Sequence, residues 1–309
     1  MSNIARRSEE WHLNRDWMVG LVAVLFLVAV KLGLSVPWEQ ALPDGLSTGA
    51  RFAPTYALAG LLVGLMVGLT GMGSGALMAP VLIFVLNVKP SLAVGSDLVY
   101  AAVTKAFGAF QHYRAGTVDL SLTRWLATGS VPGALLGAQS ISWLRGAYGE
   151  SVEVYILKAL GLAFLLVSSS ILFKTFLTRR VESVDSRLEM SGRRKGATVL
   201  LGFTVGLLVG ITSVGSGSLL MTVLILFYPI ATTRLVGTDI FHAVLLTAAA
   251  GATHFVEGNV DLALVSNLLL GSVPGIVIGS RLVSVAPERL LRTVLAVMLF
   301  LTGLKMWLS

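Results

Sequence analysis

The chain contains the stretch GLTGMGSG at residues 68–75, and a close copy of it, GITSVGSG, at residues 210–217. The two copies are 142 positions apart, and the same offset relates VGSD at 94–97 to VGTD at 236–239 without a gap. The chain is therefore an internal duplication with a glycine-rich break at the same place in each half. Paired breaks of this kind in apolar sequence are typical of membrane proteins that contain interrupted helices.

Three further pairs of motifs repeat at the same offset. They are His112 and His254, GTVD at 116–119 and GNVD at 258–261, and GSVPG at 129–133 and 271–275. We interpret each histidine as part of an interfacial turn in which Asp119 or Asp261 caps the next helix. The GSVPG motif predicts a helix kink with close packing, because proline bends a helix and glycine lets two backbones approach.

The composition places the chain in a lipid bilayer. Hydrophobic residues make up 55% of it, charged residues 13%, and its mean hydropathy is +0.83. A soluble domain usually carries about 25% charged residues, so this chain has too few to cover a surface exposed to water. The net charge of +7 does not indicate nucleic-acid binding, because the basic residues lie mostly at the ends of apolar runs rather than in a basic stripe with aromatics.

The sequence lacks the motifs of an enzyme. It has no cysteine, which excludes disulfides, thiolate metal sites and thiol nucleophiles. It contains no HExxH, Walker or GxSxG motif, and its four histidines are scattered. We therefore expect no enzymatic activity, no cofactor and no bound metal ion.

The apolar runs predict an all-α integral membrane protein, since a transmembrane helix needs about 20 apolar residues. We divide the chain into residues 1–51, with a cytoplasmic N-terminus and an extra transmembrane helix at 17–36; a first repeat at 52–177; a basic cytoplasmic linker at 178–195; and a second repeat at 196–309. Each repeat contains five apolar elements. They are 52–70, 74–88, 92–112, 122–144 and 153–177 in the first repeat, and 196–212, 216–229, 234–254, 263–284 and 288–308 in the second.

An odd number of elements in each repeat predicts that the second repeat is inverted relative to the first, about an axis in the membrane plane. Basic residues gather in the loops that this topology places beside the N-terminus, including Arg281, Arg289 and Arg292. This asymmetry predicts a cytoplasmic N-terminus and an outer C-terminus in a bacterial-type inner, or plasma, membrane. The short elements at 74–88 and 216–229 fit half-helices, and the pattern allows either crossing or re-entrant elements.

The two glycine loops are the predicted binding region. Small residues permit a tight break in a helix, and the amide N–H groups that start the next helix then attract an anion. Inversion would bring both loops toward the membrane midplane, so one small anion could lie between them. The alternative is that these small residues serve helix packing alone. The predicted substrate-binding residues of the loops are Thr70, Gly71, Gly73, Ser74, Gly75, Thr212, Gly215, Ser216 and Gly217.

Ionisable residues inside the apolar runs form the second candidate group, because a charge within a bilayer is usually paired or functional. Asp97 and Asp239 occupy equivalent positions, and each could instead be a helix cap. Lys105, two turns after Asp97, is predicted either to pair with an aspartate across the bundle or to face the anion. Asp97, Asp239 and His242 are the candidates for coupling to H⁺ or Na⁺. A histidine side chain can carry a proton near neutral pH, which is why His242 is included; its alternative role is that of a hydrogen-bonded interior histidine.

The doubled pattern resembles the TauE/SafE family of sulfite and organosulfonate exporters. The resemblance rests on two glycine loops, each followed by an apolar helix, VGSD or VGTD, and H-x-x-x-G-x-V-D, and it covers about residues 52–308. It implies a multi-span carrier that moves sulfite, sulfoacetate or a related anion outward, with the glycine loops at its centre.

Three features bear on that resemblance. The extra N-terminal helix departs from the family pattern. The loops read Gly-Ser-Gly where many members have three glycines, so Ser74 and Ser216 are expected to tune which anion fits. Related thiosulfate uptake proteins use cysteines, and this chain has none, which argues against that branch.

Together these residues predict a secondary transporter that works by alternating access, with Lys105 as the counter-charge of the anion. Its partners are the small anion, the lipid bilayer and H⁺ or Na⁺ as coupling ion; nucleic acid is not expected, and no oligomeric state follows from the sequence. A second hypothesis is a cation carrier or channel with Asp97 and Asp239 as its site. A third is a non-transporting membrane sensor or assembly protein.

Single cysteines introduced at 179–195 test the orientation, because the natural chain contains none. We expect a membrane-impermeant thiol reagent to leave them unlabelled in whole cells and to label them after permeabilisation. A cysteine near Glu257, in a predicted outer loop, is the positive control. Labelling of the linker in intact cells would reverse the orientation.

Overall fold

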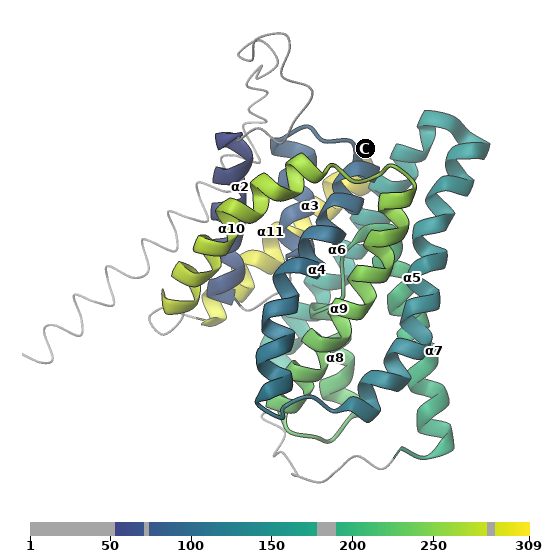
Figure 1. The fold of residues 1–309 in the computed structure, drawn as a ribbon, viewed down its shortest axis with the longest axis vertical. Helices are drawn as coiled ribbons and strands as arrows, with labels where there is room; N and C mark the ends of the chain where they lie inside the picture. Colours follow the sequence, from purple (N-terminus) through teal and green to yellow (C-terminus); the bar gives the residue numbers. More distant parts are fainter. Residues whose placement is uncertain (1–52, 71–73, 178–189, 283–287) are drawn as a thin grey trace, which may run out of the picture.

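The computed structural model describes residues 53–70, 74–177, 190–282 and 288–309, and all their regular secondary structure is helical (Figure 1). The predicted extra helix at 17–36 lies outside the described residues. The all-α class predicted from the apolar runs is therefore confirmed for the part of the chain that the structure describes.

The helices follow the predicted apolar runs closely, because each run ends where polar residues, glycine or proline follow. In the first half they are α2 (Pro54–Thr70), α3 (Gly75–Pro80) continued by the π-helical turn η2 (Val81–Val85), α4 (Pro90–Arg114), α5 (Leu120–Tyr148), the 3₁₀ turn η3 (Gly149–Ser151) and α6 (Val152–Leu177). In the second half they are α7 (Gly192–Thr212), α8 (Ser218–Phe227), α9 (Thr232–Val256), α10 (Leu262–Leu282) and α11 (Glu288–Leu308).

Five helical segments of the described chain are long and apolar enough to cross a membrane, judged by length and composition. They are Leu120–Thr175, which joins α5 and α6, Gly192–Thr212, Thr232–Val256, Leu262–Leu282 and Arg289–Leu308. By contrast, α8 has 10 residues, a length of about 15 Å, which is half of the hydrocarbon core. Its equivalent, α3 with η2, is similarly short, so both fit the predicted half-helices.

The first helix of each half packs against a helix of the other half. In the first half α2 packs along α10, and in the second half α7 packs along α5. Both pairs meet at glycines whose Cα atoms touch the opposite backbone, so that an added methyl group would overlap a carbonyl oxygen. The contacts are Gly60, Gly64 and Gly68 with Leu268, Ser272 and Ile276, and Gly202, Gly206 and Gly210 with Leu126, Ser130 and Ala134. Each contact of the first set returns in the second at the offset of 142.

Hydrogen bonds between the halves are exchanged in the same way. The backbone N–H of Asp119 donates to Thr238 Oγ1 at 2.8 Å, and that of Asp261 donates to Ser96 Oγ at 3.0 Å. The predicted caps are confirmed: Asp119 Oδ1 accepts from Leu122 N at 3.0 Å, and Asp261 Oδ1 accepts similarly in the other half. Such reciprocal contacts are what a two-fold relation between the halves produces.

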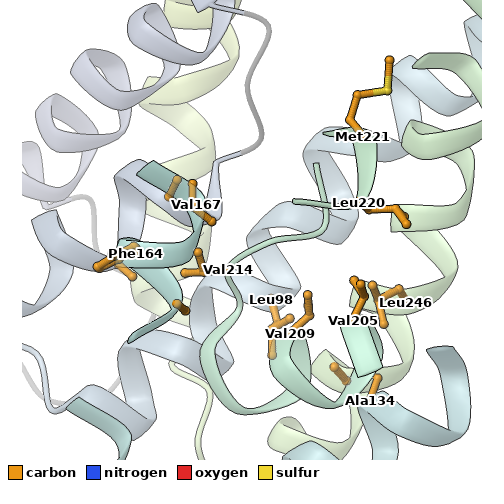
Figure 2. Close-up of a cluster of buried hydrophobic side chains, with 14 of the residues drawn as sticks. Leu98, Ala134, Phe164, Val167, Val205, Val209, Val214, Leu220, Met221 and Leu246 are labelled. Carbon is orange, nitrogen blue, oxygen red and sulfur yellow. The ribbon is translucent and has the colours of Figure 1, made fainter. Parts of the chain in front are cut away.

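One of the two hydrophobic clusters of the described chain includes the second glycine loop (Figure 2). Val214, within that loop, is fully buried and belongs to the same cluster as Phe164 and Val167 of α6. Leu98 of α4 and Val209 of α7 join this cluster. The loop is therefore held in place by apolar packing on both sides of the break.

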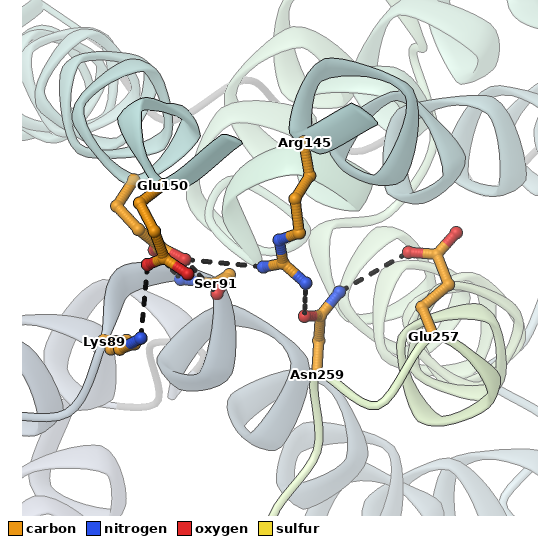
Figure 3. A network of polar contacts seen from close by, with 7 residues as sticks. Lys89, Ser91, Arg145, Glu150, Glu257 and Asn259 are labelled. Atoms are coloured by element: carbon orange, nitrogen blue, oxygen red, sulfur yellow. Dashed lines mark hydrogen bonds and ion pairs between the residues drawn. The ribbon is translucent and has the colours of Figure 1, made fainter. Parts of the chain in front are cut away.

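A polar network ties helix ends together at one end of the bundle (Figure 3). Arg145, near the end of α5, donates to Asn259 Oδ1 at 2.9 Å and lies 3.4 Å from Glu153 Oε1 at the start of α6. Glu153 also accepts from the backbone N–H and the hydroxyl of Ser91 at 2.8 and 2.6 Å. The Arg145 network comprises Lys89, Ser91, Arg145, Glu150, Glu153, Glu257 and Asn259.

Gly133→Ala tests the close helix packing. A methyl group at Gly133 of α5 would overlap the carbonyl oxygen of Phe203 in α7, so we expect a loss of about 1–3 kcal/mol of stability, seen as a lower melting temperature in detergent. Gly146→Ala, in the same helix but with nothing within 4 Å, is the matched control and should be neutral or slightly stabilising. Equal melting temperatures of the two variants would contradict the packing argument.

Candidate functional site

The second glycine loop interrupts the helical path between α7 and α8. Ser213 follows the last residue of α7 in the left-handed conformation, with φ 59°, and Gly215 has φ 112°. The hydroxyl of Thr212 donates to Leu208 O at 2.7 Å and accepts from Val214 N at 3.2 Å. Thr212, a predicted anion ligand, is thus used to stabilise the break, and it does not line the cavity described below.

The described part of the first loop lies against the second. Gly75 starts α3, and a methyl group placed on it would overlap the carbonyl oxygen of Ser213. The predicted site residues Gly71 and Gly73 lie outside the described residues. The approach of the two loops is therefore seen at Gly75 and Ser213, where only glycine leaves room for the neighbouring backbone.

A cavity of ≈ 430 Å³ lies beside the meeting point of the loops. Half-buried and buried side chains from both halves line it. The predicted site residues among them are Thr70, Ser74, Lys105, Ser216, Gly217 and Asp239. Gly75 and Gly215 instead line a small gap of ≈ 10 Å³ between the two loops. The structure thus brings together residues that are more than 100 positions apart in the sequence.

Lys105 connects α4 to the second loop. Its Nζ atom donates to Ser216 Oγ at 2.7 Å, which occupies one of the three donors of the ammonium group. Among the described residues no carboxylate oxygen lies within 4.0 Å of this ammonium. Ser74 Oγ, in the first loop, is buried and has no hydrogen-bond partner in the described part of the chain. The cavity therefore presents a cation and hydroxyl groups from both loops.

The two aspartates have different surroundings. Asp97 is fully buried, accepts from Ser213 Oγ at 2.7 Å, and does not line the cavity. Asp239 lines the cavity, and its Oδ1 has no hydrogen-bond partner among the described residues. The helix-cap alternative is wrong for both, since α4 begins at Pro90 and α9 begins at Thr232, about two turns before each aspartate.

The histidines among the described residues, His112, His242 and His254, all form hydrogen bonds within the bundle. His242 is fully buried and bonds through Nε2 to Ser130 Oγ at 2.6 Å, so it lies outside the cavity lining. His254 donates from Nε2 to Gly210 O at 2.9 Å. His112 bonds through Nδ1 to Thr117 Oγ1 at 2.8 Å. The interior, hydrogen-bonded alternative for His242 describes what the structure shows.

The cavity also contains two cations that sequence reasoning did not select as site residues. Lys174 of α6 and Arg292 of α11 both line it. The signal that identifies Lys174 is a lysine inside an apolar run. Arg292 resembles a loop charge in the sequence, but α11 begins at Glu288, so Arg292 lies within a helix that reaches the cavity. Tyr100, the sequence equivalent of His242, lines the cavity as well.

The burial of the cavity lining varies along the bundle. Its lining residues Ser74, Tyr100 and Ala243 are buried, whereas Gly108 and Lys174 are half-buried. Gly108 and Lys174 lie near the C-terminal ends of α4 and α6, whose N-terminal ends carry the Arg145 network. The half-buried part of the lining thus includes residues toward the end opposite that network.

Ser213→Ala tests the structural role of Asp97. Without the Ser213 hydroxyl the buried carboxylate loses its one hydrogen-bond donor in the described chain, so we expect a loss of about 1–3 kcal/mol of stability. The measurement is the melting temperature in detergent. Ser280→Ala, which removes an exposed hydroxyl bonded within its own helix, is the control. No difference between the two variants would contradict the role given to the Asp97–Ser213 bond.

Comparisons with known proteins agree with this architecture. The family model described as Sulfite exporter TauE/SafE matches residues 56–306. The chain is 43% identical over 249 residues to the probable membrane transporter protein YjnA of Bacillus subtilis (strain 168), which covers 81% of this chain and 97% of that protein. It is 23% identical over 244 residues to the probable membrane transporter protein YdhB of the same organism, covering 79% and 95%. No solved structure matches the chain. The family match spans most of the chain, and the protein accordingly belongs to the TauE/SafE family of membrane transporters.

Proposed function

We propose that this protein is a secondary transporter that exports a small sulfur-containing anion, namely sulfite, sulfoacetate or a related organosulfonate. The observation that carries the proposal is the 2.7 Å hydrogen bond from Lys105 to Ser216, in a cavity that Ser74 of the first glycine loop also lines. The family description names sulfite, and the geometry supplies a site suited to an oxyanion.

The chemistry of the lining suits sulfonate or sulfite oxygens. Lys105 has two donors beyond the one used by Ser216, and hydroxyl groups of Ser74 and Ser216 can donate to further oxygens. Lys174 and Arg292 add positive potential to the same cavity. A volume of ≈ 430 Å³ is within the range of small-molecule sites and leaves room for an anion with part of its hydration shell.

The shape of the cavity supports alternating access. The half-buried lining residues Gly108 and Lys174 lie toward the C-terminal ends of α4 and α6, and the Arg145 network joins the helix ends on the other side. With the orientation predicted from the basic loops, the end with the half-buried lining faces the cytoplasm, and access from that side is the state that loads an exporter. Inverted repeats that rock about the site would open the opposite end in turn.

Coupling to an ion gradient needs a group that changes charge. Asp97, Asp239 and His242 are the candidates from the sequence, and of these three Asp239 alone lines the cavity. A cation pathway through both aspartates is less well supported, because Asp97 is sealed away and Lys105, Lys174 and Arg292 would repel a cation. A non-transporting sensor does not need a polar cavity that both halves complete.

Flux into proteoliposomes tests the proposal. Vesicles are offered sulfite, sulfoacetate, taurine, sulfate and acetate in turn, with wild type beside Lys105→Gln and the double variant Ser74→Ala/Ser216→Ala. Loss of a charge-assisted hydrogen bond is worth about 1.5–3 kcal/mol, so we expect Lys105→Gln to lower selective sulfite or organosulfonate flux about 10- to 100-fold.

Lys158→Gln, at an exposed position of α6, is the matched control and should retain wild-type flux. Each variant is first shown to be folded by its melting temperature. Wild-type flux in Lys105→Gln would remove Lys105 from the site, and the absence of any anion flux in wild type would overturn the proposed function.

A further inference from the structure

The duplicated frame places two aspartates at equivalent positions, but their partners differ. The bond from Ser213 to Asp97 would have its counterpart between residue 71 and Asp239. Residue 71 is glycine, which has no hydroxyl to donate. Asp97 accepts from Ser213 with one oxygen and lies outside the cavity lining, whereas Asp239 lines the cavity. In each aspartate the buried Oδ1 atom has no hydrogen-bond partner in the described chain.

A second difference between the halves is the positive charge of Lys105, which lines the same cavity as Asp239. The counterpart of Lys105 is Thr247, a fully buried residue whose hydroxyl donates to Ala243 O at 2.7 Å within its own helix. Lys105 and Asp239 line the same cavity but form no ion pair within 4.0 Å in the described chain. An anion bound at Lys105 would therefore lie in the same cavity as the Asp239 carboxylate.

Other ionisable groups near Asp239 do not replace its role. Tyr100 is neutral in its ordinary state, and His242, one turn along α9, is bonded to Ser130 away from the cavity. The groups that face the cavity from the helices around α9 are Lys105 and Tyr100 of α4, Lys174 of α6 and Arg292 of α11.

The charge of Asp239 affects anion binding, because both lie in one site of low dielectric constant. An ionised Asp239 would repel the anion within one cavity, and this repulsion is strong where water is scarce. A proton on Asp239 removes the repulsion, offsets one negative charge of the anion and supplies one more hydrogen-bond donor to the anion.

We infer that Asp239, and not Asp97, is the proton-coupling group: it takes up a proton as the anion binds at Lys105 and releases it as the anion leaves, so that one proton crosses with each anion. This inference rests on the proposed function and names its coupling ion. Sodium suits the site less well, because a cation of that kind needs several oxygen ligands and would lie beside the Lys105 ammonium. No group of three or more carboxylate or imidazole ligands exists among the described residues.

Proton coupling is compatible with export. A dianion that crosses with one proton still carries one negative charge outward. The inside-negative membrane potential therefore drives it out, at about 2.3 kcal/mol per charge for 100 mV.

The test is the accumulation ratio of labelled sulfoacetate, with labelled sulfite as a parallel series. Proteoliposomes are given a gradient of one pH unit while the membrane potential is clamped at zero. Coupling of one proton per anion predicts about tenfold accumulation on the alkaline side in wild type. At zero potential the anion concentration ratio across the membrane must offset the about tenfold proton concentration ratio. This ratio is a thermodynamic quantity, so it does not depend on how much of a variant is folded.

The matched pair is Asp239→Asn and Asp97→Asn. We expect Asp239→Asn to exchange labelled for unlabelled anion but to give a ratio of about one, since it cannot carry the proton. Asp97→Asn should keep the tenfold ratio at whatever rate it retains. If Asp97→Asn does not fold, Ser213→Ala, which alters the same bond and leaves both carboxylates, takes its place and should keep the ratio.

Two results separate this inference from the proposed function. If wild type moves sulfoacetate or sulfite with a ratio of one, or if Asp239→Asn keeps the tenfold ratio, the inference is wrong and anion transport stands. If Asp97→Asn or Ser213→Ala loses the tenfold accumulation ratio while Asp239→Asn keeps it, Asp97 is the proton-coupling residue instead. If wild type moves neither anion, the proposed function and the inference fail together.

Discussion

Direct backbone contact between glycine-lined helices is the constraint on which the rest of the structure depends. In a lipid bilayer there is no hydrophobic driving force between two apolar helices, so close approach and dispersion must hold them together. At Gly64 and Gly206 the added bulk of a single methyl group would overlap the carbonyl oxygen of Ser272 or Ser130. Because α2 lies on α10 and α7 lies on α5, these contacts also interlock the halves, and neither half can form the cavity alone.

The interrupted helices create polar groups inside an apolar bundle, and most of them are satisfied locally. Thr212 bonds to both sides of the break, and Ser213 donates to Asp97. An unsatisfied polar group is costly in this environment unless it meets water or a ligand. Three of the groups without a partner among the described residues, Ser74 Oγ, the Tyr100 hydroxyl and Asp239 Oδ1, belong to residues that line the cavity. Others, such as Asp97 Oδ1 and His242 Nδ1, lie in the bundle outside the cavity lining.

The contacts between helices are the same in both halves, but several polar residues around the cavity are not. Reciprocal contacts such as Asp119 with Thr238 and Asp261 with Ser96 follow the duplication closely. Around the cavity, however, Lys105 corresponds to Thr247 and Ser213 corresponds to Gly71. These exchanges give one half a positive charge and place a glycine where the other half has the serine that bonds to Asp97. A duplicated scaffold can in this way hold two similar loops in place while different residues bind and couple.

The sequence by itself determined the membrane class, the helix boundaries to within a few residues and the duplication, because hydrophobicity, proline, glycine and helix caps act locally. It also identified both glycine loops and Lys105 as candidates, since a cation in an apolar run is costly. It left Asp97 and Asp239 equivalent, missed Lys174 and assigned Arg292 to a loop. Only the tertiary structure decided which side chains share the cavity, because that depends on how helices more than 100 residues apart pack against one another.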